Sequence, residues 1–396
     1  MDRKDGGSRF WMVVAAGVIG LGCGGNAGSD AGPGDSGAVQ DAPVLADAPI
    51  DAGSDAGDVD GGPCGGCGAG QACLRGVCIA SCGGDPAALD AALAAGLTPV
   101  AHVCRAGITA LDVVDGAPPR VYEVTTATSG TVTTFTLVRW TIEAGIDMPT
   151  ASVLATATHD VGAAGSLVFA GGYVAVSPDE MHVLFGYTTT DAGFVGGVFD
   201  AAVGSMTVAE TAGPGNYDAA WLDGASWLVN GLGLGTAGGA AQGLYLHDGS
   251  GDRQVAAAMG DYSGSVAVLG GVVLAGGVPA AAWPDGTMGD RVFVLDRAAL
   301  LGAGAGGVSA WTTAVSRLEV PSSFELLSGM RIASLTYDAS FAVSGIEARA
   351  LSLGVAGWTA AAPTALATGS TFSLVRGVGP TELLFVHAGG ALLVQE

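Results

Sequence analysis

The segment 174–186, "VAVSPDEMHVLFG", carries the pattern that decides the fold. An apolar run leads into a tight polar turn at Ser177–Glu180, and a second apolar run follows the turn. Two such runs around a short turn predict an antiparallel β-hairpin. The same arrangement returns four more times, with turns at Asp223–Ala225, Gly270–Gly271, Ser328–Met330 and Gly379–Thr381.

These turns recur at intervals of about 45 to 58 residues. Four strands with their turns need about 40–50 residues, which is the size of one propeller blade. The longest interval contains an insertion at residues 296–314, "DRAALLGAGAGGVSAWTTA", and a poorer copy of the turn lies earlier, at Asp115–Pro118. We therefore predict an all-β propeller of about six blades over residues 85–396. Five or seven blades are the alternative counts, and a pair of β-sandwiches is the competing architecture.

The motif "VAVSPDE" resembles the inner-strand turn "SPDG" of TolB-like and WD40-like propellers, with Glu180 where those families have glycine. The resemblance implies the same propeller fold. The chain ends on a strand, so we expect one blade to combine strands from both ends, which removes open sheet edges. A strand near Cys104–Val114 is the candidate for this closure, and Pro86–Gly96 is expected to form one or two helical turns.

The first 23 residues predict export. Basic residues precede an apolar run, Phe10–Leu21, and small residues lead to Cys23, which is the pattern of a signal peptide over residues 1–22. The ending "VIGLGCGG" resembles the lipobox of bacterial lipoproteins, although Gly20 replaces the common leucine. The resemblance implies lipidation of Cys23 and a membrane anchor, and Gly24 favours the outer membrane, facing the periplasm or the cell surface. Ordinary secretion or an uncleaved anchor are the alternatives, but the run is shorter than the roughly 20 residues that span a bilayer.

Residues 23–63 are expected to form a disordered acidic linker. The segment is built from Asp, Ala, Gly, Pro and Ser and has no aromatic or basic residue, so it cannot bury enough apolar surface to fold. A calcium site at Asp55, Asp58 and Asp60 is a less favoured alternative, because their spacing lacks the EF-hand frame and its closing glutamate.

Residues 64–84 are expected to form a disulfide-rich module. Besides Cys23 there are six cysteines, and an even number in an exported chain predicts three disulfides, with 15 possible pairings. Their spacing resembles that of small EGF-like or Dickkopf-like modules. A zinc site or a redox pair at Cys64-x-x-Cys67 is the alternative. The six cysteines are Cys64, Cys67, Cys73, Cys78, Cys82 and Cys104.

Charge excludes several functions. The net charge is −23, and Lys4, inside the predicted signal peptide, is the only lysine. The mature chain would therefore have neither a Schiff-base lysine nor a P-loop lysine. Nucleic acid is not an expected partner, because phosphate backbones attract Lys and Arg.

No residue pattern assigns a catalytic, metal-binding or cofactor-binding site. The histidines are isolated, there is no G-x-S-x-G elbow, and Asp179, Glu180, Asp223 and Asp248 are expected to serve their turns. The tryptophans are expected to pack between sheets, with sugar stacking as the alternative. These residues are His102, His159, His182, His247 and His387, and Trp221, Trp227, Trp283, Trp311 and Trp358.

We expect a lipid-anchored envelope protein whose propeller binds an unknown protein or glycan and needs no cofactor. The alternative is an exported glycan lyase or hydrolase that uses carboxylates and histidines, such as His182 or His387, in the propeller channel. A structural envelope component without a small ligand is a third possibility. Propeller folds serve many functions, so the fold alone does not decide among these.

Overall fold

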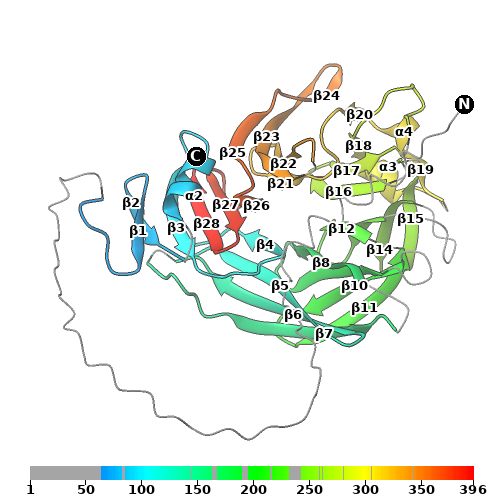
Figure 1. The fold of residues 1–396 in the computed structure, drawn as a ribbon. Helices are drawn as coiled ribbons and strands as arrows, with labels where there is room; N and C mark the ends of the chain where they lie inside the picture. Colours follow the sequence, from blue (N-terminus) through cyan, green and yellow to red (C-terminus); the bar gives the residue numbers. More distant parts are fainter. Residues whose placement is uncertain are drawn as a thin grey trace, which may run out of the picture.

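The computed structural model describes residues 64–82, 85–143, 145–162, 167–189, 195–214, 216–231, 242–257, 259–260, 262–279, 281–304, 306–340 and 342–396. Six β-sheets surround one axis and form a six-bladed β-propeller, which confirms the predicted fold class (Figure 1). None of the helices in these ranges has the length and hydropathy to cross a membrane. The predicted signal peptide, Cys23 and the linker lie outside the described residues.

Each blade is a meander that starts at the axis. Blades 1 and 2 contain β4 (Ala110–Val114), β5 (Arg120–Ser129), β6 (Val132–Thr141) and β7 (Ser152–Asp160), then β8 (Leu167–Val176), β9 (His182–Thr189), β10 (Val195–Ala202) and β11 (Thr207–Pro214). Blades 3 and 4 contain β12 (Asn216–Trp221), β13 (Trp227–Gly231), β14 (Gly243–Asp248) and β15 (Gly251–Ala257), then β16 (Tyr262–Leu269), β17 (Val272–Val278), β18 (Arg291–Asp296) and β20 (Ser316–Leu318).

Blade 5 contains β21 (Glu325–Leu327), β22 (Arg331–Tyr337), β23 (Val343–Gly354), β24 (Gly357–Ala360) and β25 (Thr364–Thr368). The long β23 pairs with β25 along its first part and with β24 along its second part. Blade 6 contains β26 (Phe372–Gly377), β27 (Glu382–His387), β28 (Gly390–Gln395) and, as its outer strand, β3 (Thr98–Val103).

The repeated turn is the connection between the first and second strands of a blade. All six predicted turns occupy this position, from Asp115–Pro118 in blade 1 to Gly379–Thr381 in blade 6. The insertion also lies where the spacing predicted it, in blade 4 between β18 and β20. It forms α3 (Arg297–Leu301), β19 (Val308–Ser309) and α4 (Ala310–Thr313), and β19 adds to the edge of blade 3.

The closing strand differs from our prediction. We expected it near Cys104–Val114, but Ala110–Val114 is β4, the innermost strand of blade 1. The strand that pairs with the C-terminal β28 is β3, Thr98–Val103. Its Pro99 lacks a backbone N–H, which weakens the strand signal in the sequence and suits an outer position where one edge has no partner.

The hydrophobic core lies mostly between neighbouring blades. Between blades 1 and 2, for example, Phe135 packs against Phe185, Tyr187 and Phe199 with ring centroids 5.3 to 6.2 Å apart. All four rings are buried. Burying a large side chain stabilises the fold by about 2 kcal/mol, so these interfaces fix the position of each blade and of its inner strand.

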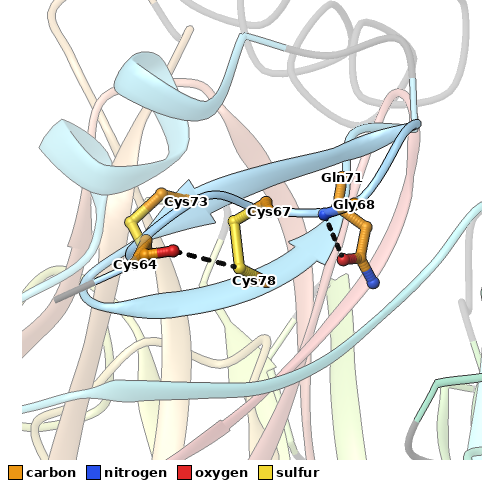
Figure 2. The surroundings of a disulfide bond; sticks show 6 residues. All are labelled: Cys64, Cys67, Gly68, Gln71, Cys73 and Cys78. Atoms are coloured by element: carbon orange, nitrogen blue, oxygen red, sulfur yellow. Dashed lines mark hydrogen bonds between the residues drawn. A yellow bond between two sulfur atoms is a disulfide. The ribbon is translucent and has the colours of Figure 1, made fainter. Parts of the chain in front are cut away.

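The cysteine-rich module is a two-stranded hairpin of β1 (Gln71–Leu74) and β2 (Val77–Ala80) beside blade 6 (Figure 1). The structure joins its six cysteines as Cys64–Cys73, Cys67–Cys78 and Cys82–Cys104. The first two disulfides lie side by side between the hairpin and the segment before it, as Figure 2 shows. The third connects the end of the hairpin to the segment after β3, at the point where the propeller closes.

The module docks on the propeller rather than standing apart. Leu74 and Ile79 are buried in one core cluster with Leu89 of α2 (Pro86–Ala92) and with blades 5 and 6. Arg75 donates hydrogen bonds to four carbonyl oxygens at and beyond the end of α2, and its Nε contacts Asp90 Oδ1 at 2.6 Å. The hairpin is therefore held by apolar burial and by a half-buried guanidinium as well as by a disulfide.

Candidate functional site

The innermost strands place four charged side chains around the propeller axis. Asp112 lies on β4, Asp218 on β12, Glu325 on β21 and Arg376 on β26, each in a different blade. We call these four residues the axial cluster. Each keeps some contact with solvent while being surrounded by the inner strands. They are the first candidates for chemistry because ionisable groups seldom stay in such places without a partner.

The two aspartates of the axial cluster make the same contacts in blades 1 and 3. Asp112 Oδ2 accepts the N–H of Val176 on the next blade at 2.8 Å, and its Oδ1 accepts the N–H of Val113. Asp218 repeats this, with Val266 N–H on its Oδ2 at 2.9 Å. Each carboxylate therefore ties the inner strand of one blade to the inner strand of the next.

Arg376 joins the remaining inner strands. Its guanidinium contacts the carboxylate of Glu325 on β21 and donates from Nε to Leu111 O on β4 at 2.9 Å. Blades 5, 6 and 1 are thereby connected through one side chain. Such charge-assisted hydrogen bonds are stronger than those between neutral groups.

Burial perturbs all three acids of the axial cluster. It raises the pKa of Asp112, and it raises the pKa of Asp218 to about 7, in both cases against the backbone hydrogen bonds and the positive charge of Arg376. Burial and the two aspartates also raise the pKa of Glu325, although Arg376 opposes this. The pKa of Asp218 is thereby moved toward the neutral range in which acid–base groups work.

A cavity of about 360 Å³ opens at the end of three of these strands. We call it the mouth cavity. It is lined by chain neighbours of the axial cluster from blades 1, 5 and 6, namely Val113, Asp115, Leu326, Ser328, Gly377, Val378, Gly379 and Pro380. A side-chain carbon placed on Gly379 would lie 3.6 Å from Glu382 Oε2 and 3.8 Å from both Asp115 carboxylate oxygens. Two carboxylates therefore lie beside Gly379 in the lining of the cavity.

The arginines of residues 85–396 do not compensate these two acids. Seven of the ten are paired with other carboxylates, among them Arg120 with Glu180, Arg331 with Glu396 and Arg376 with Glu325. The remaining three are Arg139, Arg297 and Arg317, which contact Tyr122, Leu222 O and the Trp311 ring. No salt bridge joins Asp115 or Glu382 to an arginine in the described ranges, so both carboxylates remain available to a ligand at the mouth cavity.

Histidines do not join the axial cluster. His182 pairs with Asp200 at 2.8 Å, His247 pairs with Asp252 at 2.7 Å, and His159 lies 3.7 Å from Glu210. Neither His182 nor His387, which could have lined the channel, lies on an inner strand.

His102 and His387 form a buried pair at the closure of the propeller. The N–H of Gly389 donates to His387 Nδ1, so the ring proton lies on Nε2 and points to His102 Nε2 at 2.7 Å. His102 Nδ1 then donates to Ala80 O at 2.6 Å. This chain of hydrogen bonds uses two neutral rings, and burial lowers the pKa of both, that of His387 to about 4.

Three of the five tryptophans pack between neighbouring blades, as expected. Trp221, Trp227 and Trp283 are buried, and Trp311 is sandwiched between Trp283 and Arg317. Among these five rings, Trp311 and Trp358 are half-exposed.

Three of the four acidic turn residues serve their turns as expected, whereas the Glu180 side chain contacts Arg120 and Tyr122 of blade 1. Asp179, Asp223 and Asp248 accept backbone N–H groups of their own turns.

The axial cluster was missed in the sequence, although a signal exists. Asp112, Glu325 and Arg376 each stand three residues before the first residue of the repeated turn, inside an otherwise apolar strand. Asp218 stands five residues before its turn. A single charge at this place in several repeats indicates the propeller axis, because inner strands converge there.

No protein-family model matches the chain, and no curated protein matches it. Solved structures match its fold. A putative oxidoreductase (glucose dehydrogenase) from Thermus thermophilus is 12% identical, with 76% of this chain and 98% of that chain covered and a TM-score of 0.46. The soluble aldose sugar dehydrogenase of Escherichia coli is 10% identical over the same shares, with a TM-score of 0.42. A chain of the mitotic checkpoint complex is 12% identical over 76% of this chain and 94% of its own, with a TM-score of 0.40. Likenesses at this level concern the fold and do not indicate a function.

Proposed function

We propose that this protein is a lipid-anchored envelope protein whose propeller binds a ligand with a positively charged group at the mouth cavity. The ligand is a protein or a glycan that carries amines or guanidinium groups. The observation behind this proposal is the cavity of about 360 Å³ flanked by Asp115 and Glu382. A cationic group would meet two carboxylates there, against apolar walls from Val113, Leu326 and Val378.

The overall charge supports the same class of ligand. After removal of the predicted signal peptide the chain has no lysine, and the arginines of the propeller make contacts within the protein. An acidic surface repels anionic partners and steers cationic ones, and both effects weaken as salt rises.

Titration calorimetry with two probes tests the ligand class. A tetralysine peptide and a chitosan oligosaccharide carry amines, and their N-acetylated forms are the uncharged controls. We expect the double variant Asp115→Asn/Glu382→Gln to weaken binding of at least one amine probe about tenfold or more, because the ligand loses its charge contacts. A tenfold change in Kd corresponds to about 1.4 kcal/mol of binding free energy. Glu143→Gln removes an exposed carboxylate elsewhere in blade 1 and should leave binding unchanged. Equal binding by wild type and the double variant would refute the mouth cavity as the site.

The anchor requires a separate test, since Cys23 lies outside the described residues. The intact mass of protein purified from native membranes should correspond to a chain that begins at Cys23 with added acyl groups. Reduction of three disulfides should increase this mass by that of six hydrogen atoms. Cys23→Ser should release the protein from the membrane fraction. An unlipidated mass, or one that retains residues 1–22, would contradict the anchor.

The axial cluster favours a second candidate, an exported glycan lyase or hydrolase. Burial raises the pKa of Asp218 to about 7, and acids with raised pKa values gather at catalytic sites. In this case Asp218→Asn should abolish turnover of a glycan substrate while leaving amine binding at the mouth cavity intact. A purely structural role predicts instead that Asp218→Asn lowers stability and that no turnover is found with either protein.

A further inference from the structure

We propose that Cys64, Cys67, Cys73 and Cys78 form a redox-dependent zinc site: two disulfides when oxidised, and one four-thiolate metal site when reduced. The observation is a cluster of sulfur atoms. The Sγ atoms of Cys64, Cys67 and Cys78 all lie within 4.8 Å of one another, and Cys73 is bonded to Cys64. Figure 2 shows both disulfides side by side on the β1–β2 hairpin.

The positions suit tetrahedral coordination. Zinc–sulfur bonds of about 2.3 Å place four thiolates about 3.8 Å apart. Cys73 and Cys78 are direct partners across the hairpin, and Cys64 and Cys67 stand on the preceding segment with two residues between them. Reduction lets the bonded sulfurs separate. The pairs among Cys64, Cys67 and Cys78 that are not bonded to each other need to approach by about 1 Å at most, and the Cys73 thiol has to turn toward them once it is released from Cys64.

The segment that has to adjust is rich in glycine. Gly65 and Gly66 lie between the first two cysteines with φ of +37° and +101°, and a side-chain carbon at either would touch nothing within 4 Å. The backbone there is free to turn around a metal ion. The cysteines are half-buried or exposed, so an ion can reach them.

The hairpin does not depend on these two disulfides for its position. Leu74 and Ile79 are buried against the propeller, Arg75 is held by five hydrogen bonds, and Cys82–Cys104 is a separate connection. Two of the four thiols therefore remain on a fixed strand pair after reduction. This preorganisation lowers the entropic cost of collecting four ligands.

The reaction is balanced by two equivalents of a dithiol reductant. Each dithiol passes two electrons and two protons to one protein disulfide and becomes a disulfide itself. The four resulting thiols then release four protons as Zn²⁺ forms four Zn–S bonds. Metal and oxidation thus compete for the same sulfur atoms.

Cobalt titration of the full chain tests the site. The protein is reduced with a phosphine without oxygen, and Co²⁺ is added as a spectroscopic substitute. We expect tetrahedral cobalt–thiolate absorption that saturates at one equivalent per chain, disappears when Zn²⁺ is added, and is absent from the oxidised protein. Cys67→Ser/Cys78→Ser should reduce the signal at least tenfold. Cys82→Ser/Cys104→Ser removes only the third disulfide and should retain it.

Alkylation provides a readout that does not depend on the propeller remaining folded. In the reduced chain, Zn²⁺ should slow the modification of the four cluster cysteines by iodoacetamide at least tenfold and leave Cys82 and Cys104 unaffected. The proposal fails if the reduced chain gives no cobalt–thiolate absorption, if the absorption persists in Cys67→Ser/Cys78→Ser, or if Zn²⁺ protects none of the four thiols.

Discussion

Glu180 stands in a backbone conformation that favours glycine, and its side chain explains why. Its φ is +58° in the turn between β8 and β9. Its carboxylate accepts two hydrogen bonds from Arg120, at 2.6 and 2.8 Å, and one from Tyr122 Oη at 3.1 Å. Arg120 lowers the pKa of Glu180. The residue thus links blade 1 to blade 2 from a position that is unfavourable for its backbone.

Two substitutions separate these effects. Glu180→Ala should destabilise the fold by about 1 kcal/mol, because it loses a partly exposed ion pair and keeps the left-handed backbone. Glu180→Gly loses the same pair but relieves about 1 kcal/mol of backbone strain, so its stability should be close to wild type. Urea unfolding measures both. If the alanine and glycine variants are equally stable, backbone strain at this position is negligible.

The His102–His387 pair predicts a pH dependence of stability. The pKa of His387 is about 4 in the fold and 6.5 in the unfolded chain, so the unfolded chain binds the proton first. Keeping His387 neutral therefore contributes to the free energy of unfolding in full above pH 6.5, and this contribution is lost as the pH falls to about 4. The loss is roughly 1.4 kcal/mol per pH unit, or about 3 kcal/mol in total.

The matched control for the histidine pair is His387→Gln, which removes the titration. We would measure the urea midpoints of wild type and variant near pH 7 and near pH 4.5, which lie on either side of most of this titration. The difference between the two proteins should be smaller at pH 4.5 than at pH 7, because other titrating groups affect both proteins alike. A constant difference between the two proteins at both values would show that His387 does not titrate in this range.

At the scale of elements, the least predictable part was the docking of the hairpin on α2. The sequence predicts a disulfide-rich module over residues 64–84 but not that Arg75 reaches across to Asp90, Leu93 and Leu97. Local patterns predict strands and turns because they depend on neighbours in the chain. This contact joins residues that are 15 to 22 positions apart in the chain, and the periodicity of apolar residues does not predict contacts between separate elements.

Arg75→Lys should therefore be costly although it keeps the charge. A lysine cannot reproduce the fork of five donors, so several carbonyl groups near the end of α2 lose their partner. We expect a loss of about 2 kcal/mol in urea unfolding. Arg317→Lys, where the guanidinium has one backbone hydrogen bond and stacks on Trp311, is the comparison and should cost less than about 1 kcal/mol. Equal losses would argue against a special role of Arg75.

The repeated turn made the number of blades predictable, because every blade uses it between its first two strands. The closing strand was misplaced because Pro99 interrupts its pattern, while β4 is an apolar run close to the expected position. The axial cluster could be predicted only with the blade register in hand, since its four residues come from separate repeats and meet only in the closed ring.

At the scale of the whole molecule, the disulfide Cys82–Cys104 acts on the closed ring. It spans 22 residues and connects the two ends of the segment that contains α2 and β3. A loop of this length gives about 3 kcal/mol by restricting the unfolded chain. Cys82→Ser/Cys104→Ser should lower the free energy of unfolding by about that amount and increase proteolysis before Thr98. An unchanged free energy would mean that burial of β3 alone secures the closure.

The pairing of β3 with β28 also sets the order of events during biosynthesis. A ribosome makes Thr98–Val103 long before Gly390–Gln395, so the earliest strand of the propeller waits without its neighbour while almost the whole chain is made. Blade 6 cannot assemble until the last residues emerge, whichever compartment they emerge into. A nascent chain stalled anywhere before Gly390 would hold five complete blades at most, and it would leave the β3 edge of the seam unpaired and open to wrong strand pairing.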